Sequence, residues 1–369
     1  MKLEQAKDAV MEASKQLVAL GLVARTWGNV SCKVGEGHFL ITPSGKPYEH
    51  LTKDQLVLVS LEDLSYPKGV KPSSEKKLHR EVYKQKKDVE CVIHTHQEMA
   101  SLAGLLGKNI PVSKQGRLLL GDTIPAARYG LPGTKTLVKN AGAVIAGNNV
   151  TSALLANHGS LCFGRNETET LAIAKQLEVE CKAYLTKLVP LFGEEGEDKG
   201  ETHLILTEES SAIQPQQIQN KDTIQETILK EVTKVASLLQ ENDDQIKSIL
   251  FHTSPAVLAV SRKLDKLSSY LDDFAQIAGA KIPIVEADVA RSRLIQGGKK
   301  YNALLIRDVG ALCWATTMSD AEAVVMILEK NCKAALLALE DSSVKPIGWV
   351  DTHLMRLVYQ KKYSKIAQS

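Results

Sequence analysis

The stretch Val89-Glu90-Cys91-Val92-Ile93-His94-Thr95-His96 decides the interpretation of this chain. Its apolar, β-branched run predicts a buried strand. Side chains two positions apart on a strand lie on one face, so His94 and His96 would project together. A third histidine, His158, follows the apolar run at residues 153–156, which predicts a second buried strand. The sequence therefore offers three imidazoles at the ends of two strands.

Three histidines are a suitable ligand set for a divalent metal ion. Catalytic zinc is typically held by three protein ligands that leave one position open. Each histidine alone is better explained as an unrelated core or surface residue, but the His-x-His strand with a third histidine is harder to explain as an accident, and spacing alone leaves both interpretations open. Glu75 keeps three open roles: a fourth ligand, a general base, or a carboxylate capping the helix predicted over residues 74–87.

Small polar residues and glycines cluster in the loops before His94. Loops of this composition near a helix start can bind a phosphate dianion through backbone N–H groups. As a phosphate signal they are weak, because the same residues are ordinary turn formers. The candidates are Thr26, Gly28, Asn29, Ser44, Gly45, Ser73 and Ser74.

Length and composition exclude several classes of protein. The 369 residues predict two units, and 44% hydrophobic with 24% charged residues is typical of a globular protein. A formal charge of +3 without a long basic run gives no indication of a nucleic-acid or membrane partner. Neither an export signal nor a membrane span is recognisable, which predicts a cytoplasmic protein with six reduced cysteines.

Hydrophobic periodicity places further elements. Helices are predicted over residues 2–20, 97–106 and 166–188, and strands over residues 28–33 and 38–42. A polar segment that contains several glycines and prolines follows the last of these helices. We therefore expect a catalytic domain at residues 1–189, a linker at 190–221 and a second domain at 222–369.

The second domain repeats the first. Residues 249–254, which end in His252-Thr253-Ser254, echo residues 91–96, and residues 303–313 echo residues 153–162 with one extra residue. In this alignment His96 becomes Ser254 and His158 becomes Val309. The second copy is therefore expected to be degenerate and without metal ligands.

The ordered motifs resemble those of the class II aldolase/adducin family, in particular the L-fuculose-phosphate aldolases. The resemblance rests on Gly28-Asn29-Val30-Ser31, Leu40-Ile41-Thr42-Pro43-Ser44-Gly45, Lys71-Pro72-Ser73-Ser74-Glu75, His94-Thr95-His96 and Ala156-Asn157-His158-Gly159. It implies an α/β fold, a three-layer α/β/α sandwich around a mainly antiparallel sheet, followed here by a truncated repeat of that fold.

The resemblance also implies the chemistry. Zinc, or manganese or cobalt in its place, would lie on His94, His96 and His158, with Glu75 as the acid/base and as a further ligand in the resting enzyme. The loop candidates above would bind phosphate. The reaction would be cleavage of a ketose 1-phosphate, such as L-fuculose 1-phosphate, into dihydroxyacetone phosphate and an aldehyde.

Two departures from the family keep alternatives open. The tyrosine that the aldolases carry after the segment matching Ile110-Pro111 is missing, and Asp122 either marks a turn or stands where epimerases use an acidic residue. A sugar-phosphate 4-epimerase or dehydratase, or a non-catalytic adducin-like scaffold, therefore remains an alternative. The fused repeat predicts a homo-oligomer in which two chains form a pseudo-four-fold ring.

Overall fold

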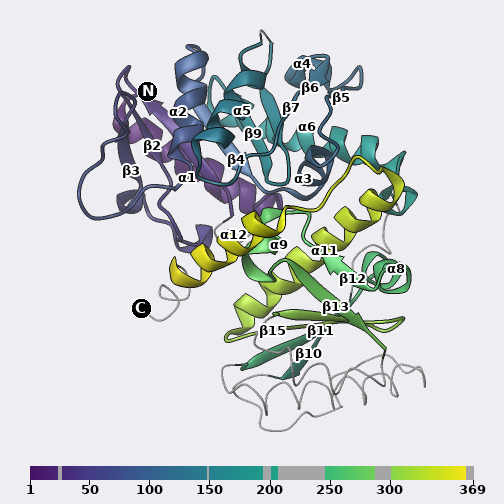
Figure 1. The fold of residues 1–369 in the computed structure, drawn as a ribbon. Helices are drawn as coiled ribbons and strands as arrows, with labels where there is room; N and C mark the ends of the chain where they lie inside the picture. The colour runs from purple at the N-terminus through teal and green to yellow at the C-terminus, as the bar shows by residue number, and fades with distance from the viewer. Residues whose placement is uncertain (24–26, 148, 194–200, 207–245, 287–300, 363–369) are drawn as a thin grey trace. The chain divides into compact units, whose positions relative to one another are not determined.

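A computed structural model describes residues 1–23, 27–147, 149–193, 201–206, 246–286 and 301–362. The chain divides into two compact units, Met1–Leu188 and Val189–Gln368 (Figure 1). Among the described residues, no helix is long and apolar enough to cross a membrane. The cytoplasmic location expected from the sequence stays a prediction.

The first unit is organised around a seven-stranded sheet in the order β3-β2-β1-β4-β9-β8-β7. Its strand pairs are antiparallel except for the parallel pair β7/β8. The sheet strands are β1 (Asn29–Val34), β2 (His38–Ile41), β3 (Val57–Ser60), β4 (Cys91–Thr95), β7 (Ala126–Ala127), β8 (Ser152–Leu155) and β9 (Gly159–Gly164). A separate hairpin pairs β5 (Ile110–Pro111) with β6 (Thr123–Ile124).

Helices cover both faces of this sheet, which makes the α/β/α sandwich that the resemblance implied. On one face, Val82 and Tyr83 of α2 (Lys76–Gln85) and Ile145 of α5 (Lys135–Ile145) share a buried core with residues of β2, β3, β4, β8 and β9. The other face carries α1 (Leu3–Ala19), α3 (Glu98–Gly104) and α6 (Glu167–Thr186). The remaining elements are η1 (Tyr48–His50), η2 (Lys53–Gln55) and α4 (Arg117–Leu120).

The termini of α3 and α6 agree with the sequence prediction to within a few residues. Asn166 caps α6, since its side chain accepts a hydrogen bond from the backbone N–H of Glu169. Glu178 of α6 in turn accepts from the backbone N–H groups of Met99 and Ala100, at 2.7 and 3.0 Å. A carboxylate from one helix therefore holds the first turn of the helix that follows His96.

Glu178 is expected to make the stability of the protein depend on pH. Burial raises the pKa of its carboxyl from 4.5 to about 7, against the two backbone N–H bonds that lower it. A raised folded-state pKa contributes stability that is present below about pH 4.5 and is lost as the pH rises through about 7. Glu178→Gln should remove this pH dependence in urea unfolding measured across that range, whereas the exposed Glu62→Gln should keep it.

The second unit contains a six-stranded sheet in the order β10-β11-β15-β14-β13-β12. From β10 to β13 this order reproduces β1-β4-β9-β8-β7, including the one parallel pair, here β13/β14. The strands are β10 (Glu201–Leu206), β11 (Ser248–Thr253), β12 (Lys266–Ser268), β13 (Lys281–Val285), β14 (Ala303–Ile306) and β15 (Gly310–Ala315). The helical elements are η3 (Pro190–Gly193), α8 (Pro255–Lys263), α9 (Asp272–Ile277), α11 (Met318–Glu340) and α12 (Trp349–Lys362).

Part of the expected linker is structured. Residues 201–206 form β10, which pairs with β11 and stands where β1 stands in the first unit. The strand begins with three polar residues that continue the charged segment before it, so the sequence favours a linker there. Residues 194–200 and 207–221 lie outside the described part of the chain, so the boundaries at 189 and 221 stay predictions.

The alignment of His252 with His94 is wrong by one residue. In the first unit Thr95 pairs with Ser160, the residue after Gly159, while in the second unit His252 pairs with Ala311, the residue after Gly310. The two β-hairpins that contain these glycines have the same length, so the extra residue of the sequence alignment is not there. Asn157 and Asp308 stand at the same place in them with φ of 61° and 60°.

The shift changes the face to which the side chain points. Because strand residues alternate between faces, His252 takes the place of Thr95 and points toward α11. Its Nε2 lies 3.2 Å from Oε2 of Glu329, and Ser254 Oγ donates to the same oxygen at 2.6 Å. His252 is thus a buried core histidine. The positions that match His94 and His96 are Phe251 and Thr253.

Candidate metal centre

The three histidines meet at one end of the first sheet. His94 lies on β4, His96 follows directly after it, and His158 lies in the turn between β8 and β9. Because β9 separates β4 from β8, the turn brings His158 beside the end of β4. The ring centroids of the three imidazoles are 4.6 to 4.9 Å apart. The same-face prediction for His94 and His96 is confirmed.

The ligand atoms converge. The Nε2 atoms of His94 and His96 are 3.1 Å apart, and one ligand atom from each of Glu75, His94, His96 and His158 lies within 4.8 Å of the others. Two nitrogens bound tetrahedrally to zinc at about 2.05 Å would be about 3.3 Å apart. The spacing of the His94 and His96 nitrogens fits a metal ion of this size.

The protonation of His94 also suits metal binding. His94 is completely buried, and its Nδ1 lies 2.8 Å from the carbonyl oxygen of Ser160. A carbonyl only accepts, so Nδ1 carries a proton and Nε2 is the nitrogen that faces the cluster. This backbone bond is the support that metal-binding histidines commonly receive, because it fixes both the tautomer and the orientation of the ring.

Glu75 points into the cluster. It stands at the N-cap position of α2, but its side chain makes no capping bond, so the capping alternative is wrong. Its Oε2 lies 3.0 Å from Nε2 of His94, and its Oε1 lies 2.8 Å from Nε2 of His158. Burial opposes ionisation, but these two histidines outweigh it and hold the pKa of the Glu75 carboxyl well below its ordinary value.

Two of the predicted phosphate loops lie against each other. The backbone N–H of Ser44 donates to the carbonyl of Lys71 at 2.9 Å, and that of Ser73 donates to Thr42 at 3.1 Å. Ser44, Gly45, Ser73 and Ser74 are therefore neighbours at the start of α2. Ser73 is buried and Ser74 is exposed. Thr26 lies outside the described residues.

Two glycines permit close approach of the backbones that carry the cluster. A Cβ on Gly159 would lie 2.3 Å from the carbonyl oxygen of Thr95. A Cβ on Gly28, whose φ is +114°, would lie 2.7 Å from that of His94. Any larger residue would push β9 or the start of β1 away from β4. Gly28 thus has a packing role beside the cluster, which the sequence interpretation did not foresee.

A hydrogen-bonded chain behind Glu75 was missed. Asn29 Nδ2 donates to Oε2 of Glu75 at 3.0 Å, and Asn29 Oδ1 contacts Nε2 of His79. Nδ1 of His79 lies 2.6 Å from Ser31 Oγ, which lies 2.8 Å from the hydroxyl of Tyr83. The signal was present in the sequence, since His79 follows Glu75 by one helical turn and Ser31 follows Asn29 on one strand face.

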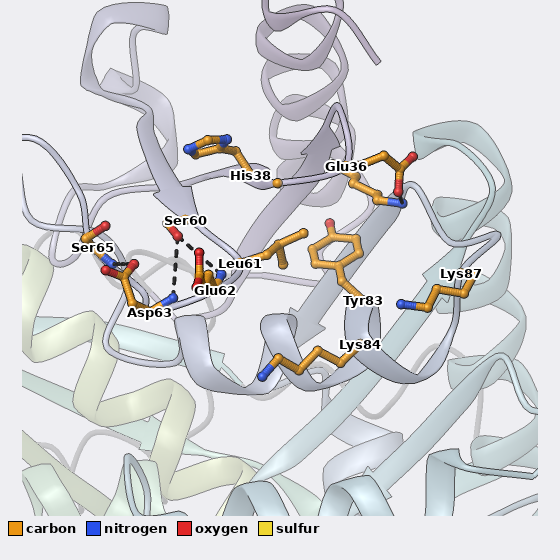
Figure 2. Close-up of a pocket in the computed structure, with 12 residues that line it drawn as sticks. Glu36, His38, Ser60, Leu61, Glu62, Asp63, Ser65, Tyr83, Lys84 and Lys87 are labelled. Carbon is orange, nitrogen blue, oxygen red and sulfur yellow. Dashed lines mark hydrogen bonds and ion pairs between the residues drawn. The ribbon is translucent and has the colours of Figure 1, made fainter.

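A separate pocket lies on the same unit, near β2, β3 and α2. Its volume is about 590 Å³, and its walls include Tyr83, Leu61, Lys84 and Lys87 (Figure 2). None of the four cluster residues lines it. Its acidic and basic side chains are mixed, so its charge does not indicate one class of ligand.

Comparison with models of known families shows to which family the chain belongs. The model of the class II aldolase and adducin N-terminal domain matches residues 8–185 and again residues 236–336, which is more than half of the chain. The chain belongs to the class II aldolase/adducin family. The two matched segments fall in the two units, in agreement with the duplicated fold.

Individual members of the class II aldolase/adducin family are similar to about half of the chain. The L-fuculose phosphate aldolase of Escherichia coli K12 is 31% identical over 196 residues, which cover 50% of this chain and 87% of that protein. The 5-methylthioribulose-1-phosphate/5-deoxyribulose-1-phosphate aldolase of Rhodospirillum rubrum is 31% identical over 179 residues, with 48% and 79% covered. A solved L-fuculose 1-phosphate aldolase is 29% identical, with 52% and 88% covered and a TM-score of 0.47.

Proposed function

We propose that the first unit is a metal-dependent aldolase that cleaves a ketose 1-phosphate into dihydroxyacetone phosphate and an aldehyde. The observation that carries this proposal is the convergence of three imidazole Nε2 atoms with the Glu75 carboxylate. Zinc is the ion that we propose for this set, because three histidines with a carboxylate are a common zinc environment. Manganese or cobalt would bind the same ligands.

The roles of the side chains follow from their chemistry. His94, His96 and His158 would hold the metal, which supplies Lewis-acid stabilisation of negative charge on the substrate oxygens. In the cleavage direction the C4 hydroxyl would lose its proton as the C3–C4 bond breaks and the aldehyde forms, and Glu75, protonated at its expense by way of solvent, would deliver a proton to C3. In the condensation direction Glu75 would remove the proton from C3. The ionised carboxylate is the form that a base requires.

The phosphate group would lie at the start of α2. Ser44, Gly45, Ser73 and Ser74 lie together there, and the helix start provides backbone N–H groups and a partial positive charge for a dianion. Asn29 has its amide turned toward Glu75, so one of its N–H bonds is already used. We retain Gly28, Asn29 and Thr26 as neighbours of this phosphate site.

The segment without the expected tyrosine has a different organisation. Ser113 donates its backbone N–H and its hydroxyl to Glu180, at 2.8 and 2.6 Å. Asp122 is exposed and lies 3.4 Å from Arg117, after the turn at Gly121 with φ of +73°. These contacts favour the turn role of Asp122 over an epimerase role.

Product analysis tests the proposal. Purified full-length protein, with its metal content measured, would be incubated with L-fuculose 1-phosphate, 5-methylthioribulose 1-phosphate and 5-deoxyribulose 1-phosphate. We expect dihydroxyacetone phosphate from at least one of them, detected by its enzymatic reduction, and its loss after chelation of the metal. An isomer with an intact carbon skeleton would support the epimerase. Protein that binds no metal and releases no product would support the scaffold.

The expected homo-oligomer is part of the same proposal. The two matched segments give the chain two copies of the family fold, so two chains would bring four copies together. Light scattering of the full-length protein should give the mass of two chains. A monomer at micromolar concentration would exclude the pseudo-four-fold ring.

A further inference from the structure

The side-chain amide of Asn29 is buried and has two different partners. Asn29 is 4% exposed on β1, beside His94 on β4. One end of its amide faces Glu75 and the other faces His79, which is completely buried on α2. If this buried amide were turned the other way, no water could satisfy its N–H and carbonyl groups. Its orientation therefore determines which group faces Glu75.

The hydrogen-bonding capacity of each group fixes the direction of the whole chain. The ionised carboxylate of Glu75 only accepts, so Asn29 presents its NH₂ to it and turns Oδ1 toward His79. His79 Nε2 must then donate. A neutral imidazole has one N–H, so its Nδ1 accepts from the hydroxyl of Ser31, and Ser31 Oγ in turn accepts from Tyr83.

We propose that His79 is a positioning residue that fixes the amide of Asn29 and thereby aims Oε2 of Glu75 at the metal cluster. This role rests on the proposed function, because Glu75 is the proton-transfer group there. In the opposite orientation, Oδ1 of Asn29 would lie 3.0 Å from the carboxylate oxygen and repel it. Ser31 selects the Nε2–H tautomer, so it acts on Glu75 through His79.

The surroundings of His79 keep its imidazole in one protonation state. Burial, with the neighbouring His94, lowers the pKa of His79 to about 3, in spite of the opposing charge of Glu75. His79 is therefore a neutral donor throughout the physiological range.

Kinetics of matched variants test the role. In His79→Leu we expect kcat to fall at least about ten-fold with KM within about two-fold and metal content unchanged, since substrate and metal contacts remain. His79→Gln keeps an N–H donor and should recover most of kcat. Ser31→Ala should lie between His79→Leu and wild type. The exposed His38→Leu, on the neighbouring strand β2, is the control.

Several results would overturn the proposal. One is an unchanged kcat in His79→Leu; another is a folded His79→Gln that is as slow as His79→Leu. Tyr83→Phe separates positioning from proton conduction along the chain, because it leaves the Ser31 hydroxyl free to donate to His79. A loss in Tyr83→Phe equal to that in His79→Leu would indicate conduction, and so would overturn positioning.

Nitrogen-15 NMR of histidine-labelled wild-type protein gives a readout without activity. We expect His79 to carry its proton on Nε2, unchanged between about pH 5 and 8. A proton on Nδ1, or a doubly protonated ring in that range, would overturn the assignment even if the aldolase reaction is confirmed. Failure to release dihydroxyacetone phosphate would instead count against the proposed function.

Discussion

Replacing His94 by alanine is expected to remove the bound metal and almost all dihydroxyacetone phosphate release. The proposed metal would provide several kcal/mol of transition-state stabilisation, so kcat/KM should fall about 10³-fold or more. Metal content by elemental analysis and product release would be measured on the same sample. The exposed His38→Ala, also on the first sheet, should leave both unchanged.

His94 is buried, so its loss also leaves the carbonyl of Ser160 without its partner. His96→Ala separates the two effects, because His96 is partly exposed at the end of the strand. Its replacement would remove a proposed ligand and disturb the core less. We expect the same metal loss in His96→Ala with a circular dichroism spectrum like that of wild type. Full metal content in a folded His96→Ala would exclude it as a ligand.

Glu75→Gln is expected to lower kcat by about 10² to 10⁴ while much of the metal remains bound. The amide keeps the shape of the carboxylate but cannot take a proton. Exchange of the C3 proton of dihydroxyacetone phosphate with deuterated solvent, followed by NMR without any aldehyde, should disappear in this variant. This exchange isolates the proton transfer from cleavage of the carbon–carbon bond.

The exposed Glu49→Gln serves as the charge control for Glu75→Gln and should exchange at the wild-type rate. Normal exchange in Glu75→Gln would reassign the base. Loss of metal together with loss of exchange would assign Glu75 as an essential ligand, and its role as base would then need a variant that retains the ion.

The pairing of His94 with His96 was predictable from local spacing, and the full ligand set was predictable from the resemblance to the family. The alternation of β4 places His94 and His96 on one face, and the apolar run before His158 ends at the same edge of the sheet. The position of Glu75 at a helix start was also foreseen. The direction of its side chain was not foreseen, because a carboxylate at the start of a helix can either turn back to cap the helix or point away from it.

The rest depends on pairing between distant segments. The register of β11 against β15 is set by the close approach of Gly310 to the backbone of His252, and no run of letters in either strand reveals it. Because the dipeptide His-Thr occurs in both strands, the sequence alignment matched His252 with His94, one position away from its structural match. In the same way, the bond between Ser31 and His79 requires β1 to lie under α2, a contact that appears only when the sheet is assembled.

His94 lies on β4, between β1 and β9, in the interior of the sheet. Its backbone belongs to the part of a domain that opens only when the whole domain unfolds. We therefore expect the position of His94 to be set during folding, before any ion binds. Metal binding would then need no ordering of a loop around His94, so the ion could be lost and regained there without a change of fold.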